Sequence, residues 1–249
     1  MPRIARQAPG GIVYHVLNRG GPRGGRMTLF DKPADYDAFI RVVEDTLLAR
    51  PMRILGYCLM PNHWHLILWP RENGDLAAFM QRLTITHVRR WLEHRHLVGT
   101  GHVYQGRFKS FAVEADEHLC TLLRYVERNP LRANLVKRAE DWQWSSLRRR
   151  CPPASAIKEA TPSATPSPTA DAGRKPLLTP LPIDLPADWV KRVNRPETSK
   201  ELERLRTSVN RGRPFGGEAW TRRTVARLGL PATLRGRGRP RKEERNEAT

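Results

Sequence analysis

The order of the apolar segments between residues 12 and 113 restricts the fold more than any other feature of the chain. Four segments have the apolar, β-branched character of strands, and two repeat apolar residues at the spacing of amphipathic helices. Their order is that of the split βαβ unit, in which two helices lie on one face of a four-stranded sheet. The sequence therefore predicts an α+β, ferredoxin-like βαββαβ fold. The expected segments are residues 12–17, 34–48, 52–59, 63–69, 75–96 and 103–113.

The fourth of these segments begins with two histidines separated by one residue, directly after the tight turn at residues 60–62. A strand advances about 3.3 Å per residue and alternates its faces, so His63 and His65 point the same way, roughly 6.6 Å apart at Cα. Two imidazoles at that separation can bind one metal ion, while Trp64 enters the core. The alternative is that both are ordinary polar positions or hydrogen-bonded core histidines.

A further helix, expected over residues 116–129, carries the second group of candidate residues. Tyr125 and Asn129 are four residues apart and therefore share a helix face. A nucleophile and an oxygen ligand on one face can serve the same ion. Two structural roles compete with this interpretation: Tyr125 as a buried aromatic, and Asn129 as the N-cap of a new helix that begins with Pro130.

The charge of the chain indicates its partner. There are 44 Lys and Arg residues against 25 Asp and Glu, a net charge of +19, which is typical of nucleic-acid binders. The sequence has no apolar run long enough to cross a bilayer and no basic amphipathic helix with a wide apolar face, so we expect no membrane partner. The first residues lack the apolar core of a signal peptide, and the three cysteines have no CxxC spacing, so we expect a cytoplasmic, nucleoid-associated protein with reduced thiols.

Composition divides the chain into three parts. Residues 1–150 have the mixed periodicity of one compact domain of helices and strands, and residues 151–188 form a Pro-, Ala-, Ser- and Thr-rich stretch that is expected to be a linker. Residues 189–249 are basic, with helices expected near 199–209 and 221–228. The end of this segment is similar to an AT-hook, which would place Arg237 and Arg239 in a DNA minor groove; a basic tail without groove preference is the alternative.

Three short motifs in this order resemble the REP-associated tyrosine transposases, which belong to the IS200-like, single-tyrosine HUH superfamily. The motifs are Met60-Pro61-Asn62-His63-Trp64-His65, Arg124-Tyr125-Val126-Glu127-Arg128-Asn129-Pro130 and Trp142-Gln143-Trp144-Ser145-Ser146. The resemblance covers about residues 9–150, including Tyr14-His15-Val16 and Asn18-Arg19-Gly20.

This resemblance implies both a mechanism and a substrate. His63, His65 and Asn129 would hold a divalent cation, Mg²⁺ or Mn²⁺, although imidazole also accepts Zn²⁺. Tyr125 would attack a phosphodiester of single-stranded DNA, forming a 5′-phosphotyrosine bond and releasing a 3′-hydroxyl. The expected substrate is a hairpin formed by a REP-like palindrome, and the superfamily allows a monomer or a homodimer.

Basic residues near this centre are the expected DNA contacts. Three arginines recur at four-residue spacing around Tyr125, and two basic residues alternate on the last expected strand, where a solvated basic face is the alternative. With the first-strand motif, these candidates are Arg19, Arg107, Lys109, Arg124, Arg128 and Arg132.

Two other functions remain open from the sequence. One is a noncatalytic regulatory protein that binds DNA hairpins with the same scaffold. The other is a zinc hydrolase that uses His15 with His63 and His65, for which the sequence offers no clear general base.

Overall fold

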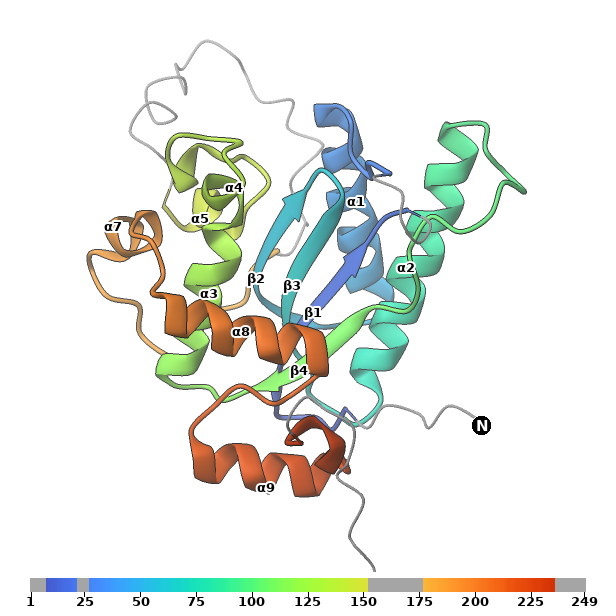
Figure 1. Cartoon of the computed structure of the whole chain (residues 1–249). Coiled ribbons are helices and arrows are strands. Elements are labelled where there is room, and N and C mark those ends of the chain that lie inside the picture. Colours follow the sequence, from blue (N-terminus) through green and yellow to red (C-terminus); the bar gives the residue numbers. More distant parts are fainter. Residues whose placement is uncertain (1–7, 22–26, 152–176, 236–249) are drawn as a thin grey trace, which may run out of the picture.

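A four-stranded antiparallel sheet forms the centre of the computed structural model, which describes residues 8–21, 27–151 and 177–235 (Figure 1). The strands lie side by side in the order β2-β3-β1-β4, so β3 and β1 are central. Along the chain, the order β1-α1-β2-β3-α2-β4 matches the prediction, and the predicted α+β class is confirmed. The strands are β1 (Val13–Arg19), β2 (Arg53–Met60), β3 (His63–Trp69) and β4 (Lys109–Val113).

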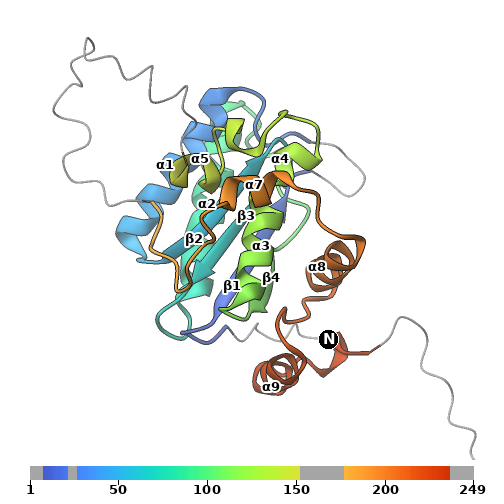
Figure 2. The same cartoon turned by 90° about the vertical axis from the view of Figure 1, so that its left-hand side faces the viewer.

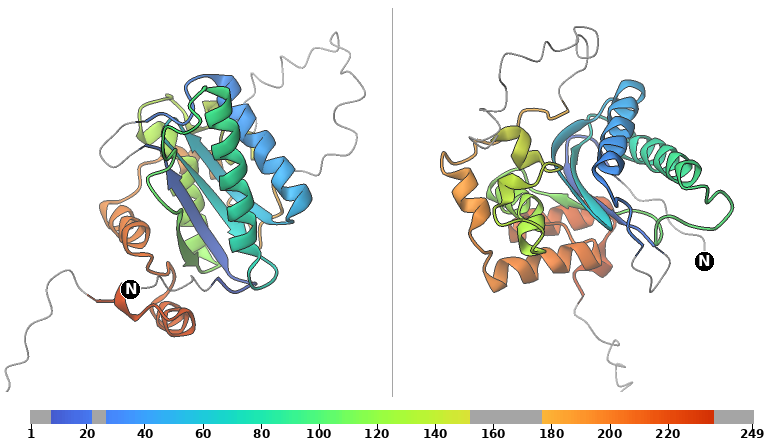
Figure 3. Two further views of the ribbon diagram at one scale, coloured as in Figure 1. Left: turned by 90° about the vertical axis from the view of Figure 1, so that its right-hand side faces the viewer. Right: turned by 90° about the horizontal axis from the view of Figure 1, so that it is seen from above.

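Two helices, α1 (Pro33–Ala49) and α2 (Asp75–His94), cover one face of the sheet (Figure 3). Proline suits the first turn of α1, where its missing N–H has no helical partner. The buried sides of the two helices include Phe39 and Phe79, which pack with Trp64 of β3 in one apolar cluster. Both helices therefore bury the periodic apolar positions that predicted them.

The opposite face of the sheet is covered by α3 (Glu117–Glu127) and by helices from the C-terminal part of the chain (Figure 2). α7 (Trp189–Asn194) and α8 (Ser199–Arg211) lie outside α3 and close its flank. Trp189 and Leu205 of these helices share an apolar cluster with Leu123 of α3. The C-terminal helices thus extend the core around α3. The remaining elements are α4 (Asn129–Arg132), η1 (Ala139–Asp141), α5 (Ser146–Arg150), α9 (Glu218–Leu228) and η2 (Pro231–Thr233).

Both outer strands of the sheet are covered by later segments. Along β2, the backbone N–H of Leu59 donates to the Trp144 carbonyl (2.9 Å), and that of Tyr57 donates to Ser146 Oγ (3.1 Å). Along β4, Phe215 pairs with Val113 in a parallel bridge. Outer strands with free N–H and C=O groups can pair with other chains, so these contacts protect the sheet. The motif at residues 142–146 has this structural role.

The last strand is shorter than predicted. The sequence predicted a strand over residues 103–113, whereas β4 begins at Lys109. Tyr104 forms an isolated bridge with Gly20, and the N–H of Gln105 donates to the Arg19 carbonyl (3.0 Å), so residues 104–105 already pair with the end of β1. Residues 106–108 interrupt the pairing. The prediction that Arg107 alternates with Lys109 on one strand is therefore wrong.

The helix predicted over residues 116–129 is divided into α3 and α4 around Arg128. Proline lacks an N–H group and cannot continue the hydrogen-bond ladder, so Pro130 separates the two helices. Arg128 keeps helical dihedral angles (φ −81°, ψ −10°), which leaves Tyr125 and Asn129 in nearly helical register. The sequence did not predict α5 or α7.

Some predictions fall outside the described residues. These are most of the expected linker, residues 152–176, and the AT-hook-like end with Arg237 and Arg239. Within the described part of the chain, no helix is both long enough and apolar enough to span a membrane.

Candidate active site

The central strand β3 presents His63 and His65 on the face that carries α3. Their ring centroids are 5.0 Å apart. Trp64 points to the other face, is fully buried, and donates its indole N–H to the Tyr104 hydroxyl (2.9 Å). The alternation of the strand thus brings the two imidazoles together, as the spacing predicted.

Hydrogen bonds on both sides of His65 define its tautomer. The Asn129 amide nitrogen lies 3.2 Å from Nε2 of His65, and Nε2 of His15 lies 2.8 Å from its Nδ1. An amide N–H donates, so His65 Nε2 accepts with its lone pair and the ring carries its proton on Nδ1. That proton is donated to His15 Nε2. His65 therefore directs a lone pair at Asn129.

His15 completes this arrangement from β1. Its ring stacks on His65 with centroids 5.0 Å apart, and it is fully buried. Because its Nε2 accepts, its proton lies on Nδ1, and this atom is buried without a hydrogen-bond partner. Leaving a buried donor unpaired costs about 1–3 kcal/mol. His15 is thus held in a position that its own hydrogen bonding does not favour.

The other imidazole is also oriented by its neighbour. His63 Nδ1 lies 2.7 Å from the side-chain oxygen of Asn62, which accepts the Nδ1 proton. The lone pair of His63 is therefore on Nε2. Histidines that ligate metals commonly donate their second N–H to an oxygen in this way, which fixes the ring.

Burial keeps these imidazoles uncharged. Desolvation lowers the pKa of His63 to about 4 and the pKa of His15 to about 3, and it lowers the pKa of His65 well below the usual value. A metal ion binds only the neutral imidazole, so no proton has to be displaced near pH 7. Two oriented lone pairs on neutral rings fit a divalent cation.

The buried histidines also predict how stability depends on pH. Burial lowers the pKa of His87, whose Nδ1 lies 2.7 Å from the Tyr104 hydroxyl, to about 3. Between about pH 6.5 and pH 3 the unfolded chain therefore binds a proton here that the folded chain does not. We expect the free energy of unfolding to fall as pH is lowered from 7 to 5, by roughly 2 kcal/mol for each such histidine.

Urea unfolding at the two pH values measures this difference. A His87→Phe variant is expected to lose one histidine's share of the pH dependence, whatever its stability at pH 7. An unchanged pH dependence in that variant would show that His87 is not held neutral.

The side chain of Asn129 does not cap a helix, so the predicted N-cap role is wrong. α4 has Arg128 as its N-cap and no capping side chain. The Asn129 oxygen accepts from the Arg132 guanidinium (2.9 Å), which turns its nitrogen toward His65. For the oxygen to face His65 instead, the amide must turn over and Arg132 must release it.

Tyr125 lies against the same imidazole. Its ring meets His65 edge to face, with centroids 6.1 Å apart at 90°. The Arg132 guanidinium lies 4.2 Å from the centre of the Tyr125 ring. The ring is partly buried and packs against the apolar cluster under α3, so it has part of the alternative role of a buried aromatic. Side chains from β1, β3, α3 and α4 thus converge on one point.

Comparison with known proteins matches the stretch that contains His63, His65 and Tyr125 to a protein family. The family model described as "Transposase IS200 like" matches residues 13–129, the stretch that runs from β1 to Asn129. This part of the chain is similar to the IS200-like transposases.

Two relatives and one solved structure have a more specific name than the family model. A REP-associated tyrosine transposase of Escherichia coli is 28% identical over 144 residues, which is 56% of this chain and 78% of the relative. A Haemophilus influenzae protein with a provisional form of the same name is 26% identical over 146 residues, 53% of this chain and 83% of the relative. A solved structure of a REP-associated tyrosine transposase bound to a REP hairpin aligns at 19% identity and a TM-score of 0.48, covering 72% of this chain and 100% of its own.

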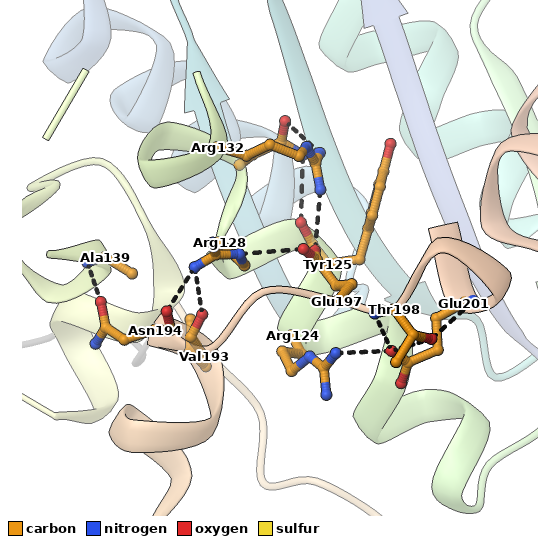
Figure 4. A network of polar contacts seen from close by, with 11 residues as sticks. Arg124, Tyr125, Arg128, Arg132, Ala139, Val193, Asn194, Glu197, Thr198 and Glu201 are labelled. Carbon is orange, nitrogen blue, oxygen red and sulfur yellow. Dashed lines mark hydrogen bonds and ion pairs between the residues drawn. The ribbon is translucent and has the colours of Figure 1, made fainter. Parts of the chain in front are cut away.

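In this IS200-like domain, the three arginines around Tyr125 face the C-terminal segment (Figure 4). Glu197 accepts from Arg128 (3.1 Å) and Arg132 (3.0 Å), and Glu201 accepts from Arg124 (2.9 Å). The Glu197 side chain is only 2% exposed, so these pairs are largely shielded from water. The predicted DNA contacts of these arginines stay predictions, and in this structure their charges are paired within the chain.

The remaining predicted cations lie at the same end of the sheet as His63. Arg19 ends β1 directly opposite His63. Lys109 is exposed at the start of β4, and Arg107 is exposed in the loop before it. All three are accessible to DNA, and their contact with it stays a prediction.

A second group of possible ligands lies near the start of α3. Within the described residues, ligand atoms of Glu114, Asp116 and His118 lie within 4.8 Å of one another. Asp116 is the N-cap of α3 and accepts from the His118 backbone, while the Arg204 guanidinium lies 3.3 Å from His118 Nε2. The Arg204 side chain thus contacts His118 Nε2, and Asp116 serves as a helix cap, so both residues already have structural contacts.

Sequence reasoning missed two contributions to the IS200-like site. Glu197 pairs with Arg128 and Arg132, which lie more than 60 residues earlier in the chain, and no local pattern marks such pairs. His15 was considered only as a third metal ligand, whereas its position beside His65 follows from the pairing of β1 with β3. A polar residue in the middle of a strand that is otherwise apolar was the available signal.

Proposed function

We propose that this chain cuts and rejoins single-stranded DNA beside palindromic hairpins, using Tyr125 as the nucleophile. The supporting observation is that Tyr125 and Asn129 both contact the His65 imidazole, next to His63. A nucleophile thus lies beside two neutral, oriented imidazoles and an amide. The match to the IS200-like family model and the similarity to the REP-associated relatives support a DNA hairpin as substrate.

His63 Nε2 and His65 Nε2 would hold the divalent cation, with the Asn129 oxygen after its amide has turned. When bound, a divalent ion neutralises charge that develops on the phosphate. Mg²⁺ and Mn²⁺ suit a mixed nitrogen and oxygen ligand set with open positions. We propose that the bound ion is Mg²⁺ or Mn²⁺.

The bond changes at Tyr125 follow from the chemistry of a phosphodiester. The Tyr125 oxygen bonds to phosphorus, the bond from phosphorus to the 3′ oxygen breaks, and the strand downstream of the cut stays attached to the protein through the phosphate at its 5′ end. The phenol proton is released to solvent and the leaving 3′ oxygen takes one up, so the step is balanced. Because the covalent bond stores the energy of the broken one, a 3′-hydroxyl can later reverse the attack without ATP.

Incubation with end-labelled hairpin DNA and Mn²⁺ or Mg²⁺, followed by a denaturing gel, tests this function. We expect a slowly migrating protein–DNA adduct that disappears when the metal is chelated. A hairpin shift on a native gel without any adduct would instead support a noncatalytic hairpin-binding protein.

His15 provides a prediction about the proposed metal site. It accepts the Nδ1 proton of His65 and so keeps the Nε2 lone pair of His65 available. Replacing His15 with phenylalanine retains an aromatic ring but removes the acceptor. We expect Mn²⁺ affinity to fall by about 10- to 100-fold, the usual effect of losing such a partner. Free Mn²⁺, measured by electron paramagnetic resonance during a titration, gives this affinity.

His15→Gln is the matched variant, because its amide oxygen reaches the place of Nε2 and is expected to restore most of the affinity. Equal Mn²⁺ affinity in the wild type and the phenylalanine variant would contradict the role of His15. Failure of the wild type to bind Mn²⁺ would contradict the metal site itself.

A further inference from the structure

A groove of about 790 Å³ lies between α7 and the chain that follows α4. Its walls come from two parts of the chain that are more than 40 residues apart in sequence. Five of the ten lining residues are cationic and one is acidic. The cations are Arg128, Lys137, Arg138, Lys191 and Arg195, and the acid is Asp188.

Three of the groove's cations form no ion pair among the described residues. Asp188 is paired with Arg192 (2.7 Å), which is outside the lining, and Arg138 is paired with Glu140. Arg128 is paired with Glu197. The other three cations form no ion pair within residues 8–21, 27–151 and 177–235. These are Lys137, Lys191 and Arg195, and all three are exposed.

The walls of the groove are tied together. Arg128 donates to the carbonyl oxygens of Asn194 (2.8 Å) and Val193 (3.3 Å), at the end of α7. The Asn194 side chain accepts from the Ala139 backbone (2.9 Å) and donates to Glu140 (2.7 Å) on the other wall. The two walls that carry the positive charges are therefore held together without a ligand, which lowers the entropy cost of binding one.

The groove is connected to the candidate active site through Arg128, which directly follows α3, the helix that carries Tyr125. Arg128 lines the groove and shares Glu197 with Arg132, whose guanidinium lies over the Tyr125 ring. Figure 4 shows Arg128 between Asn194 on one side and Tyr125 on the other. A strand whose phosphate reacts at Tyr125 can thus continue over Arg128 into the groove.

We propose that this groove binds the phosphate backbone of the single-stranded DNA that flanks the cleaved hairpin. The proposal rests on the proposed function, because it places the substrate at Tyr125. Phosphates would pair with Lys137, Lys191 and Arg195, while Leu131 and Val190 offer apolar contacts to exposed bases. Cationic walls with an apolar contact surface suit a single strand, whose bases are unpaired.

Charge reversal in the groove tests this directly. The groove variant is Lys137→Glu/Lys191→Glu/Arg195→Glu. The control variant, Arg41→Glu/Arg50→Glu/Arg82→Glu, changes the net charge by the same amount on α1, at the C-terminal end of α1 and on α2, and these two helices cover the other face of the sheet. Dissociation constants are measured over a range of NaCl concentrations for a hairpin with a long single-stranded extension. Each lost phosphate contact reduces the magnitude of the slope of log K against log salt by about 0.7. We therefore expect the magnitude of this slope to be smaller by about 2 in the groove variant than in the wild type.

The groove variant is also expected to bind the extended hairpin at least tenfold more weakly at low salt, with little change for a hairpin without the extension. An unchanged slope, an equal loss in the α1–α2 variant, or an equal loss for both DNAs would overturn the proposal. The wild-type adduct assay is independent of these slopes, so failure of the proposed function is distinguished from failure of the groove.

Discussion

Replacing Tyr125 with phenylalanine is expected to abolish the covalent protein–DNA adduct while hairpin affinity stays within about twofold of the wild type. Phenylalanine lacks the oxygen that would attack phosphorus, and no neighbouring side chain can replace it in the same position. The phenyl ring retains the edge-to-face contact with His65 and the contact with Arg132. Denaturing and native gels on the same samples measure adduct and affinity.

Tyr36→Phe is the matched control for this experiment. Tyr36 is buried on the opposite face of the sheet, where its ring stacks on Trp144 with centroids 4.0 Å apart. Removing its hydroxyl is expected to leave the adduct unchanged. An adduct that persists in the Tyr125 variant would mean that another residue is the nucleophile.

The second large effect concerns stability. Glu127 is fully buried at the end of α3. It accepts hydrogen bonds from Ser146 Oγ (2.6 Å), Trp189 Nε1 (2.8 Å) and Arg150 Nε (3.2 Å). These partners belong to α5 and α7, so one carboxylate joins three helices. Removing it leaves the Trp189 indole N–H without its acceptor and the Arg150 guanidinium without its carboxylate, with only the Leu55 carbonyl as a remaining partner. We expect Glu127→Ala to lower the free energy of unfolding by about 3–5 kcal/mol.

Urea unfolding at pH 7 measures this loss, with Glu203→Ala as the control. Glu203 is an exposed glutamate on α8, and its truncation is expected to change stability by no more than about 0.5 kcal/mol. Glu127→Gln keeps the shape and one acceptor oxygen, so its loss is expected to lie between the two. A Glu127→Ala protein as stable as the wild type would contradict the role of this network.

Periodicity alone was enough to predict the sheet, the two helices on its first face and the orientation of His63, Trp64 and His65. These features depend on local alternation, which the sequence displays directly. The interruption before β4 depends on how residues 104–105 pair with the end of β1, and that pairing involves residues more than 80 positions apart.

The site was predicted as a set of residues but not as a hydrogen-bonded network. Spacing placed Tyr125 and Asn129 on one face, yet it also suggested a cap that the structure does not contain. The contact of His65 with His15 depends on the register of β1 against β3, where Leu17 rather than His15 is directly opposite. The pairing of Arg132 with Glu197 depends on how α7 and α8 close against α3.

Peptide mapping of the DNA adduct tests the central claim most directly. After the adduct forms in Mn²⁺, nuclease digestion leaves a short nucleotide, and trypsin cuts after Arg124 and Arg128. We predict by mass spectrometry that the peptide of residues 125–128 carries a 5′-linked nucleotide on Tyr125. A nucleotide on any other peptide, or an unmodified 125–128 peptide in purified adduct, would contradict the assignment of Tyr125 as the nucleophile.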